Sequence, residues 1–255
     1  MKKYAVITGA SSGIGAEFAK QLAKQGYSLI LTARRKTRLE KLARHLRTDC
    51  EIITADLTDL SECKQVYDRI ADKNIEIFIN NAGFGDCSPF LEGDLEKELQ
   101  MIDLNIRAVH FFTKRILQKM HRANYGYLLN VASSAGLIPA GPYMAGYYAA
   151  KSYVTSLTRA VAAESAECGS SVYIGCLCPG PVDTEFNHVA NVQFKLKGIT
   201  AASCVSYALR QMKRRKTVII PSFSMRFLIF CGHFIPETLY IRLVSCQQKK
   251  KIYKK

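Results

Sequence analysis

Near its amino terminus the chain reads Thr8-Gly9-Ala10-Ser11-Ser12-Gly13-Ile14-Gly15. A short apolar run over 4–8 comes just before, and apolar residues at helical spacing follow over 13–25. The first glycine permits a tight turn, the second lets a phosphate approach the backbone, and the third lets the helix pack on the strand. The helix end adds N–H groups and a partial positive charge. The segment therefore predicts a pyrophosphate-binding turn, with an ordinary strand-to-helix turn as the alternative.

Apolar runs alternate with helical stretches along most of the remaining chain. Parallel strands need such helical crossovers, and short uninterrupted apolar strands indicate a sheet covered on both faces. The predicted fold is a doubly wound (Rossmann) α/β domain with a seven-stranded parallel sheet, and its ligands lie at the carboxyl ends of the strands. Strands are expected at 4–8, 28–32, 51–55, 76–80, 127–132, 172–177 and 217–221, and helices at 13–25, 36–47, 59–71, 94–120 (two helices), 145–167 and 201–213.

Length and composition indicate a single globular domain. The chain has 255 residues, of which 48% are hydrophobic and 22% charged, which argues against a disordered or fibrous protein. It contains no apolar run long enough to span a membrane, and the run before the glycine turn is too short for a targeting segment. The nine cysteines form no C-x-x-C pair and no zinc-type cluster with histidine. We therefore expect free thiols in the cytoplasm and no metal site.

The positive charge is concentrated at the carboxyl end. The net charge is +15, and residues 210–255 contain twelve Lys or Arg but one acid, Glu237. We divide the chain into a dinucleotide-binding domain, 1–221, and an apolar and basic extension, 222–255. The extension could contact an anionic membrane surface, pack on the domain, contact another subunit, or be a solvated end. No nucleic-acid-binding motif accompanies the charge, so nucleic acid is not an expected partner.

The end of the second predicted strand indicates which dinucleotide is bound. NAD sites usually place an acid there to bind the ribose 2′-hydroxyl. Here the strand ends with Arg34 and Arg35, whose guanidinium groups can pair with a 2′-phosphate. The sequence therefore favours NADP(H), although the arginines could simply begin a solvated helix. NAD(H) remains the alternative cofactor.

The start of the helix at 145–167 carries a candidate proton-transfer pair. Tyr147 and Lys151 are four residues apart and share one helix face. An ammonium beside a phenol favours phenolate, so we expect the Tyr147 pKa to lie below its usual value and the side chain to act as an acid or base. Ser134, thirteen residues before Tyr147, ends the fifth strand and could hold a carbonyl oxygen. Each of these residues alone also fits a helix surface or a turn.

Two further strand ends carry polar or turn-forming residues. The fourth predicted strand ends Asn80-Asn81-Ala82-Gly83, and the sixth is followed by Pro179-Gly180-Pro181-Val182-Asp183-Thr184. Each segment alone would indicate only a turn. Both fall at strand carboxyl ends, where this fold places its ligand.

Together these segments resemble the classical short-chain dehydrogenase/reductase family over residues 4–221. The order and spacing match T-G-x-x-x-G-I-G, N-N-A-G, an Asn on the next helix, S-x12-Y-x3-K and P-G-x-x-x-T. The resemblance implies a catalytic tetrad of Asn105, Ser134, Tyr147 and Lys151. The thirteen-residue offset favours Ser134 over Ser133, and Tyr147 over Tyr148.

The resemblance also implies a role for each matching residue. Tyr147 would be the general acid in carbonyl reduction and the base in alcohol oxidation, and Ser134 would orient the carbonyl. Lys151 would hold the nicotinamide ribose and lower the Tyr147 pKa, and Asn105 would hold a water that links Lys151 to solvent. The implied cofactor contacts are Gly9, Ser11, Ser12, Gly13, Ile14, Gly15, Arg34, Arg35, Asp56, Leu57, Asn81, Ala82, Gly83, Tyr147, Lys151, Pro179, Gly180, Val182 and Thr184. Ser12 stands where many NADP(H) members carry a basic residue, so the NADP(H) preference rests on the two arginines.

These observations predict an NADP(H)-dependent oxidoreductase that interconverts a carbonyl and an alcohol. The apolar segment after Thr184 (Phe186, Val189, Val192, Phe194 and Leu196, with Gly198 as hinge) would cover a hydrophobic substrate, or it could fill core space. Self-association to a dimer or tetramer is expected by analogy alone. The alternative function is a catalytically idle NADP-binding regulator.

Overall fold

The computed structural model describes residues 2–186 and 198–252. It contains a seven-stranded parallel sheet with the strand order β3-β2-β1-β4-β5-β6-β9, which confirms the predicted fold class. The strands are β1 (Tyr4–Thr8), β2 (Ser28–Ala33), β3 (Cys50–Thr54), β4 (Ile75–Asn80), β5 (Tyr127–Val131), β6 (Tyr173–Leu177) and β9 (Val218–Ile219). A separate two-stranded pair, which the sequence did not predict, joins β7 (Val182–Asp183) to β8 (Ile199–Thr200).

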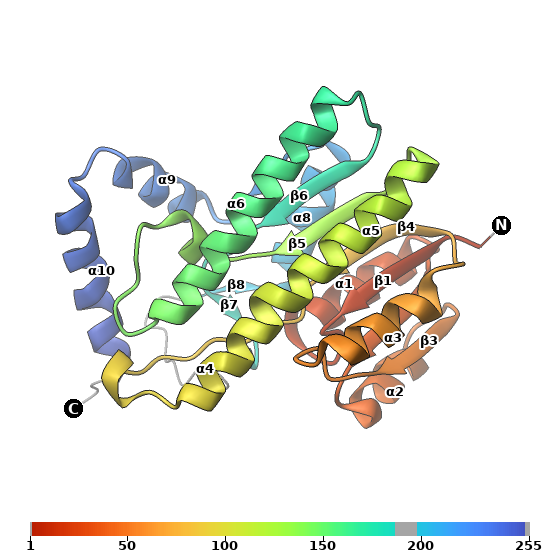
Figure 1. Ribbon diagram of the computed structural model, residues 1–255, viewed down its shortest axis with the longest axis horizontal. Coiled ribbons are helices and arrows are strands. Elements are labelled where there is room, and N and C mark those ends of the chain that lie inside the picture. Colours follow the sequence, from red (N-terminus) through yellow and green to blue (C-terminus); the bar gives the residue numbers. More distant parts are fainter. Residues whose placement is uncertain (1, 187–197, 253–255) are drawn as a thin grey trace.

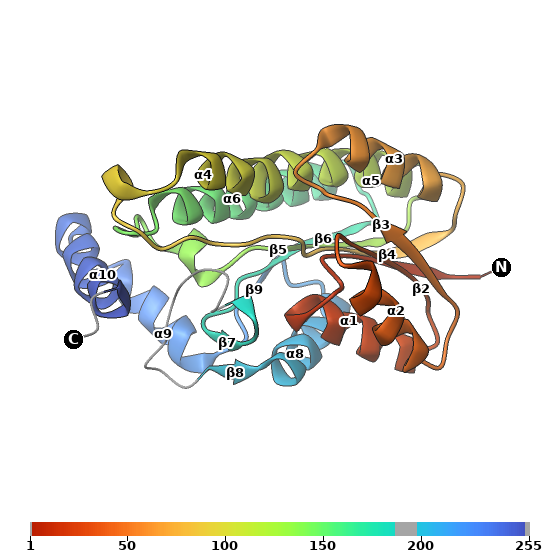
Figure 2. The same ribbon diagram turned by 90° about the horizontal axis from the view of Figure 1, so that it is seen from below.

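Helices cover both faces of the sheet (Figures 1 and 2). One layer holds α1 (Gly13–Lys24), α2 (Lys36–Arg44) and α8 (Ala201–Lys213), and the other holds α3 (Leu60–Ile70), α4 (Leu95–Ile102), α5 (Val109–Ala123) and α6 (Ala145–Glu167). The central strands β1, β2 and β4 are buried almost throughout because both faces are covered. Two apolar cores result, one on each side of the sheet.

The strand order reverses direction between β1 and β4. The chain winds outward from β1 through β2 to β3, returns to pair β4 with β1, and then continues through β5 and β6 to β9. Loops leave the carboxyl ends of β1 and β4 in opposite directions at this point, which opens a crevice there. Asn81 ties the two strand ends together, since its Nδ2 donates to the Thr8 carbonyl at 2.9 Å.

The predicted helical region 94–120 forms one nearly continuous rod. Asp94 caps α4 by accepting hydrogen bonds from the backbone N–H groups of Glu96 and Lys97. A π-helical stretch (Asp103–Ala108) then joins α4 to α5, and Asn105 lies within it. Such a stretch widens the helix locally and is common at functional sites.

The carboxyl-terminal extension folds into two helices, α9 (Phe223–Gly232) and α10 (Glu237–Ile252), at one end of the molecule (Figure 1). Tyr240 and Val244 of α10 join an apolar cluster with Tyr147 and Tyr148. Gln248 Nε2 donates to the Tyr148 hydroxyl at 2.7 Å. The extension is therefore packed against the residues of the predicted site. No helix in the described part of the chain is both long and apolar enough to cross a bilayer.

Close packing of the turn after β5 against α6 yields a stability prediction. A Cβ on Gly136 would overlap the Lys151 backbone carbonyl, whereas one on Gly146 would meet the flexible Met101 methyl at 2.9 Å. We expect Gly136→Ala to lower the free energy of unfolding by about 1–3 kcal/mol, because the backbone must shift. Gly146→Ala is the matched control and should be nearly neutral. Urea unfolding measures the free energy of unfolding of both variants. Equal losses would contradict the close contact between Gly136 and the Lys151 carbonyl.

Candidate active site

A cavity of about 800 Å³ runs along the carboxyl edge of the sheet, and nearly all the predicted site residues line it. Asn105 and Gly15 are not among the lining residues. The predicted residues that line it are Gly9, Ser11, Ser12, Gly13, Ile14, Arg34, Arg35, Asp56, Leu57, Asn81, Ala82, Gly83, Ser134, Tyr147, Lys151, Pro179, Gly180, Val182 and Thr184.

The glycine turn forms one end of this cavity. Gly9 and Gly13 have φ values of +65° and +56°, a region that side chains disfavour. A Cβ on Gly15 would overlap the Gly9 carbonyl, so Gly15 serves close packing of α1 on the turn. Ser12, the residue before α1, makes no side-chain capping hydrogen bond, which leaves the first-turn amides for a ligand. These features fit a diphosphate group.

Arginines lie beside the glycine turn. Arg35 donates through Nη2 to the hydroxyls of Ser11 at 3.0 Å and Ser12 at 2.9 Å. Arg34 Nη1 lies 3.6 Å from a carboxylate oxygen of Asp56. The two predicted arginines therefore have different partners. Arg35 contacts the glycine turn, whereas Arg34 pairs with Asp56, which follows β3.

Sequence reasoning missed two further charged residues here, Arg38 and Glu185. Arg38 Nη1 lies 2.6 Å from Glu185, and Arg35 Nη1 lies 3.2 Å from the same carboxylate. The hydrogen bond from Arg38 is the largest cause that lowers the Glu185 pKa. Glu185 is 147 residues from Arg38 in sequence, so no local signal predicted the pair. Arg35, which contacts the phosphate turn, and Arg38 thus share one carboxylate.

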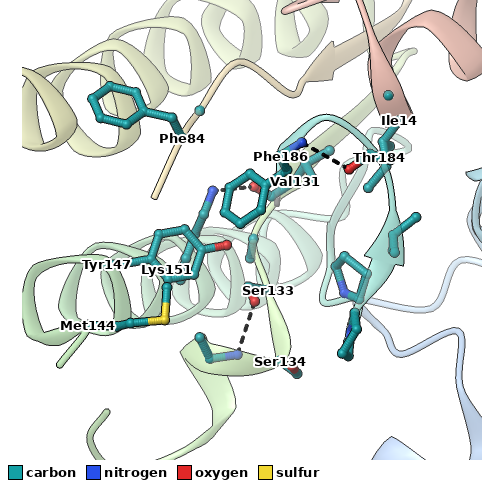
Figure 3. Close-up of a pocket in the computed structure, with 18 of the residues that line it drawn as sticks. Ile14, Phe84, Val131, Ser133, Ser134, Met144, Tyr147, Lys151, Thr184 and Phe186 are labelled. Atoms are coloured by element: carbon teal, nitrogen blue, oxygen red, sulfur yellow. Dashed lines mark hydrogen bonds between the residues drawn. The ribbon is translucent and has the colours of Figure 1, made fainter. Parts of the chain in front are cut away.

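Tyr147 and Lys151 lie at the other side of the cavity, on the first turns of α6 (Figure 3). Both are buried, with exposures of 8% and 4%. Lys151 Nζ donates to the Val131 carbonyl at 3.0 Å and lies 5.7 Å from the centre of the Tyr147 ring. Burial lowers the pKa of Lys151 to about 8, because it penalises the ammonium.

The predicted direction of the Tyr147 pKa is wrong for the described structure. Burial raises the pKa of Tyr147 to about 12, and a hydrogen bond with the Ser133 side chain opposes this effect. The Lys151 ammonium lies over the ring, and the desolvation of the phenol outweighs any charge effect. Tyr147 is therefore protonated at neutral pH.

The structure brings Ser133, and not the predicted Ser134, to the Tyr147 hydroxyl. Ser133 makes the hydrogen bond to Tyr147, and its Oγ also accepts from the Ala135 backbone N–H at 3.1 Å. In Figure 3 Ser133 lies nearer to the Tyr147 hydroxyl than Ser134 does, and its dashed line marks the bond from the Ala135 N–H. The chain is extended at Ser133 and a 3-10 turn begins at Ser134, so the two side chains diverge. The thirteen-residue offset selected the wrong neighbour.

Asn105 lies behind the cavity wall. It is fully buried, its Nδ2 donates to the Phe84 carbonyl at 2.7 Å, and its Oδ1 accepts from the Phe84 N–H at 3.2 Å. A Cβ on Gly83 would lie 3.3 Å from Lys151 Nζ and would overlap Asn105 Oδ1. The glycine after β4 thus lets Asn105 and Lys151 approach the same point.

The segment after β6 closes another side of the cavity. Phe186 packs on Tyr147 with ring centroids 5.6 Å apart. Gly198, just before β8, lies against the backbone of Pro181, just before β7. Val189, Val192, Phe194 and Leu196 lie outside the described residues. Within the described part of the chain, no group of His, Cys, Asp and Glu could hold a metal ion.

Comparison with known proteins identifies the family. A family model described as short chain dehydrogenase matches residues 3–194. An oxidoreductase of Staphylococcus epidermidis is 33% identical over 214 residues, which cover 82% of this chain and 92% of that protein. The chain belongs to the short-chain dehydrogenase/reductase family. It is thereby assigned to a class of oxidoreductase enzymes.

Other short-chain dehydrogenase/reductase members extend the comparison. The structure of a short-chain dehydrogenase from Sphingobium yanoikuyae in complex with NADPH has a TM-score of 0.82 at 31% identity, and the match covers 91% of this chain and 93% of that one. The very-long-chain 3-oxoacyl-CoA reductase of Anas platyrhynchos is 32% identical over 200 residues, or 75% of this chain and 63% of that protein. A member from Burkholderia phymatum in complex with NAD, 22% identical with a TM-score of 0.83, shares the fold.

The buried Lys151 of this short-chain dehydrogenase/reductase predicts a stability that depends on pH. Its folded pKa is about 8, whereas an unfolded lysine has a pKa of about 10.4. Between these values the unfolded chain holds the proton and the folded chain releases it, so this group makes the parent more stable as pH rises. Relative to Lys151→Met, the parent should gain about 2 kcal/mol of unfolding free energy from pH 7 to 10.

Urea unfolding at each pH measures this difference. Lys36→Met, which removes an exposed lysine, is the control and should follow the parent at every pH. A difference between parent and Lys151→Met that stays constant from pH 7 to 10 would contradict burial of the ammonium.

Proposed function

We propose that the protein is an NADP(H)-dependent oxidoreductase that interconverts a carbonyl and an alcohol on a hydrophobic substrate. One observation carries this proposal. Tyr147, Ser133 and Lys151 are gathered at one side of a cavity whose other end is lined by the glycine turn, Arg34 and Arg35. A cavity of about 800 Å³ is within the size range of ligand sites.

The arginines support the preference for NADP(H). Arg35 and Arg38 share the Glu185 carboxylate, and a 2′-phosphate could replace that carboxylate as their partner. The NADPH complex of the Sphingobium yanoikuyae relative agrees with this proposal. The glycine turn would hold the pyrophosphate, and Asp56 with Leu57 would lie by the adenine. NAD(H) stays the alternative.

When bound, the reduced nicotinamide supplies a hydride to the carbonyl carbon. The protein supplies the proton. Tyr147, protonated because of its burial, gives its hydroxyl hydrogen to the carbonyl oxygen, and the resulting phenolate is stabilised by the nearby Lys151 ammonium. Ser133 orients the carbonyl beside Tyr147, which is the role that the sequence predicts for Ser134. In alcohol oxidation the same proton moves in reverse. Asn105 would connect Lys151 to solvent through a water.

The cavity lining supports an amphipathic substrate. Met144, Ile138 and Phe186 surround Tyr147, and apolar residues of α9 and α10 extend the same wall. Among the described residues, the Tyr240 hydroxyl and Gln248 Oε1 are buried without a hydrogen-bond partner, and both residues line the cavity. Such groups favour a polar substituent on the substrate. The Anas platyrhynchos relative is named for a lipid substrate, which agrees with this class.

Self-association and a cytoplasmic location are part of the same proposal. Leu95, Leu99 and Ile102 form an exposed apolar stripe on α4, which supports contact with another copy. The idle regulatory alternative has no specific observation in its favour.

The central experiment measures NADPH oxidation against ketones, aldehydes, acyl thioesters, steroids and retinoids. With any active substrate, we expect Tyr147→Phe to lower kcat by about 10²–10⁴-fold, because the proton donor is lost. Ser133→Ala should lower it by about 10²–10³-fold, since a donor to the carbonyl oxygen is removed.

Ser134→Ala is the matched control and should retain activity within about threefold, because Ser134 does not face Tyr147. NADPH fluorescence should show normal cofactor binding in all three variants. A Ser134→Ala loss equal to that of Ser133→Ala would overturn the assignment of Ser133. No turnover of any carbonyl by a protein that binds NADPH would favour the regulatory alternative.

Cofactor preference rests on Arg35 and Arg38. We expect Arg35→Ala/Arg38→Ala to raise the KM for NADPH by about tenfold or more and to leave the KM for NADH almost unchanged, since only NADPH carries the 2′-phosphate. Glu185→Gln should lower the KM for NADPH, because a competing carboxylate is removed. Steady-state kinetics with both cofactors measure these effects, and equal losses with both would contradict the assignment.

A further inference from the structure

The α9 helix carries an exposed aromatic stripe. Phe223, Phe227 and Phe230 follow at intervals of four and three residues, which places them on one face of α9, and Phe234 follows in the turn after the helix. Phe230 and Phe234 are 63% and 75% exposed and pack edge to face, with ring centroids 5.3 Å apart. Exposed apolar patches of this kind mark interaction sites. Nothing in the proposed chemistry uses this stripe.

The adjacent helix α10 continues the apolar surface. Leu239 and Leu243, one helical turn apart, are about half exposed. Both views place α9 and α10 together at one end of the molecule, away from α1 (Figures 1 and 2). Exposed apolar side chains of the two helices come together where Phe227 and Leu243 line the same cavity. We call the exposed apolar groups of the two helices the α9–α10 face and define it by Phe223, Phe227, Phe230, Phe234, Leu239 and Leu243.

Cationic side chains accompany this face. Arg226 lies over the rings of Phe223 and Tyr207, at 5.7 and 5.5 Å from their centres. Arg242 and Lys249 are exposed on α10. Glu237 is the one acid in the sequence from Arg210 onward. The face thus combines aromatic and aliphatic groups with positive charge, as in helices that lie at a lipid–water interface.

The cavity opens at the same face. Phe227 and Leu243 line the cavity, and each is also more than half exposed. Leu228 likewise lines the cavity and is 46% exposed. Two side chains of the α9–α10 face, Phe227 and Leu243, therefore lie at the rim of the cavity.

We propose that the α9–α10 face docks on an anionic lipid surface, with the rim of the cavity turned toward the lipid. The stripe would enter the head-group region, and the cations would meet lipid phosphates. Docking does not depend on the proposed oxidoreductase function. The further idea that substrate enters the cavity from the lipid does depend on it. A second copy is a poorer occupant, because self-pairing through this face would bring Arg226, Arg242 and Lys249 of both copies together.

Vesicle co-sedimentation of the full chain tests docking without any measurement of activity. The parent should bind vesicles of phosphatidylcholine with phosphatidylglycerol about tenfold or more tightly than phosphatidylcholine alone, and binding should weaken as salt rises. Phe230→Ser/Phe234→Ser should lower binding to the anionic vesicles by about tenfold or more, because apolar insertion is lost. Neither phenylalanine lines the cavity, so NADPH binding and the unfolding midpoint serve as fold controls.

A pair of charge reversals tests the electrostatic part. Arg242→Glu/Lys249→Glu should lower binding to anionic vesicles by about tenfold or more. Lys20→Glu/Lys24→Glu changes the net charge equally on exposed positions of α1 and should change binding by no more than about twofold.

Three results would overturn docking. These are equal binding to both vesicle types, equal losses for the two charge-reversal pairs, and no loss for Phe230→Ser/Phe234→Ser. A fall in oligomeric mass of Phe230→Ser/Phe234→Ser without vesicles, together with unchanged vesicle binding, would assign the face to a second copy instead.

Discussion

The buried ammonium of Lys151 is the constraint on which the rest of the site depends. Its hydrogen bond to the Val131 carbonyl fixes the first turns of α6 to the carboxyl end of β5. Burial of a charge is costly, which the lowered pKa of about 8 reflects. Two glycines let the neighbouring backbone approach Lys151 closely. Gly136 lies against the backbone carbonyl of Lys151, and Gly83 lies near the Lys151 Nζ.

This arrangement places a protonated phenol in a buried position beside a cation. A Tyr147 pKa of about 12 keeps the phenol protonated, so a proton is present to be donated, and the same burial would strengthen the interaction of a phenolate with Lys151. The cavity changes character along its length, from guanidinium groups at the glycine turn to apolar side chains from α9 and α10. The cationic end of the cavity would suit a charged dinucleotide, and the apolar end would suit an amphipathic substrate.

The sequence predicted the main sheet because each of its seven strands carries a local signal. All seven strands follow from short apolar runs. The choice of Ser134 failed because spacing cannot reveal which of two neighbours an extended residue before a 3-10 turn directs inward. The prediction of a lowered Tyr147 pKa failed because the i,i+4 spacing shows that Lys151 is near but does not show that Tyr147 is buried.

Other features needed the folded chain. The pair of Arg38 and Glu185 forms across 147 residues, and α9 and α10 reach the cavity from the far end of the sequence.

The central claim is that Tyr147, Ser133 and Lys151 act on a dinucleotide held at the glycine turn. Its most direct test is a crystal structure with bound NADP⁺. We expect the nicotinamide to lie beside Tyr147 and Ser133, with Lys151 on its ribose and the 2′-phosphate at Arg35 and Arg38. A dinucleotide bound away from Tyr147 would contradict it.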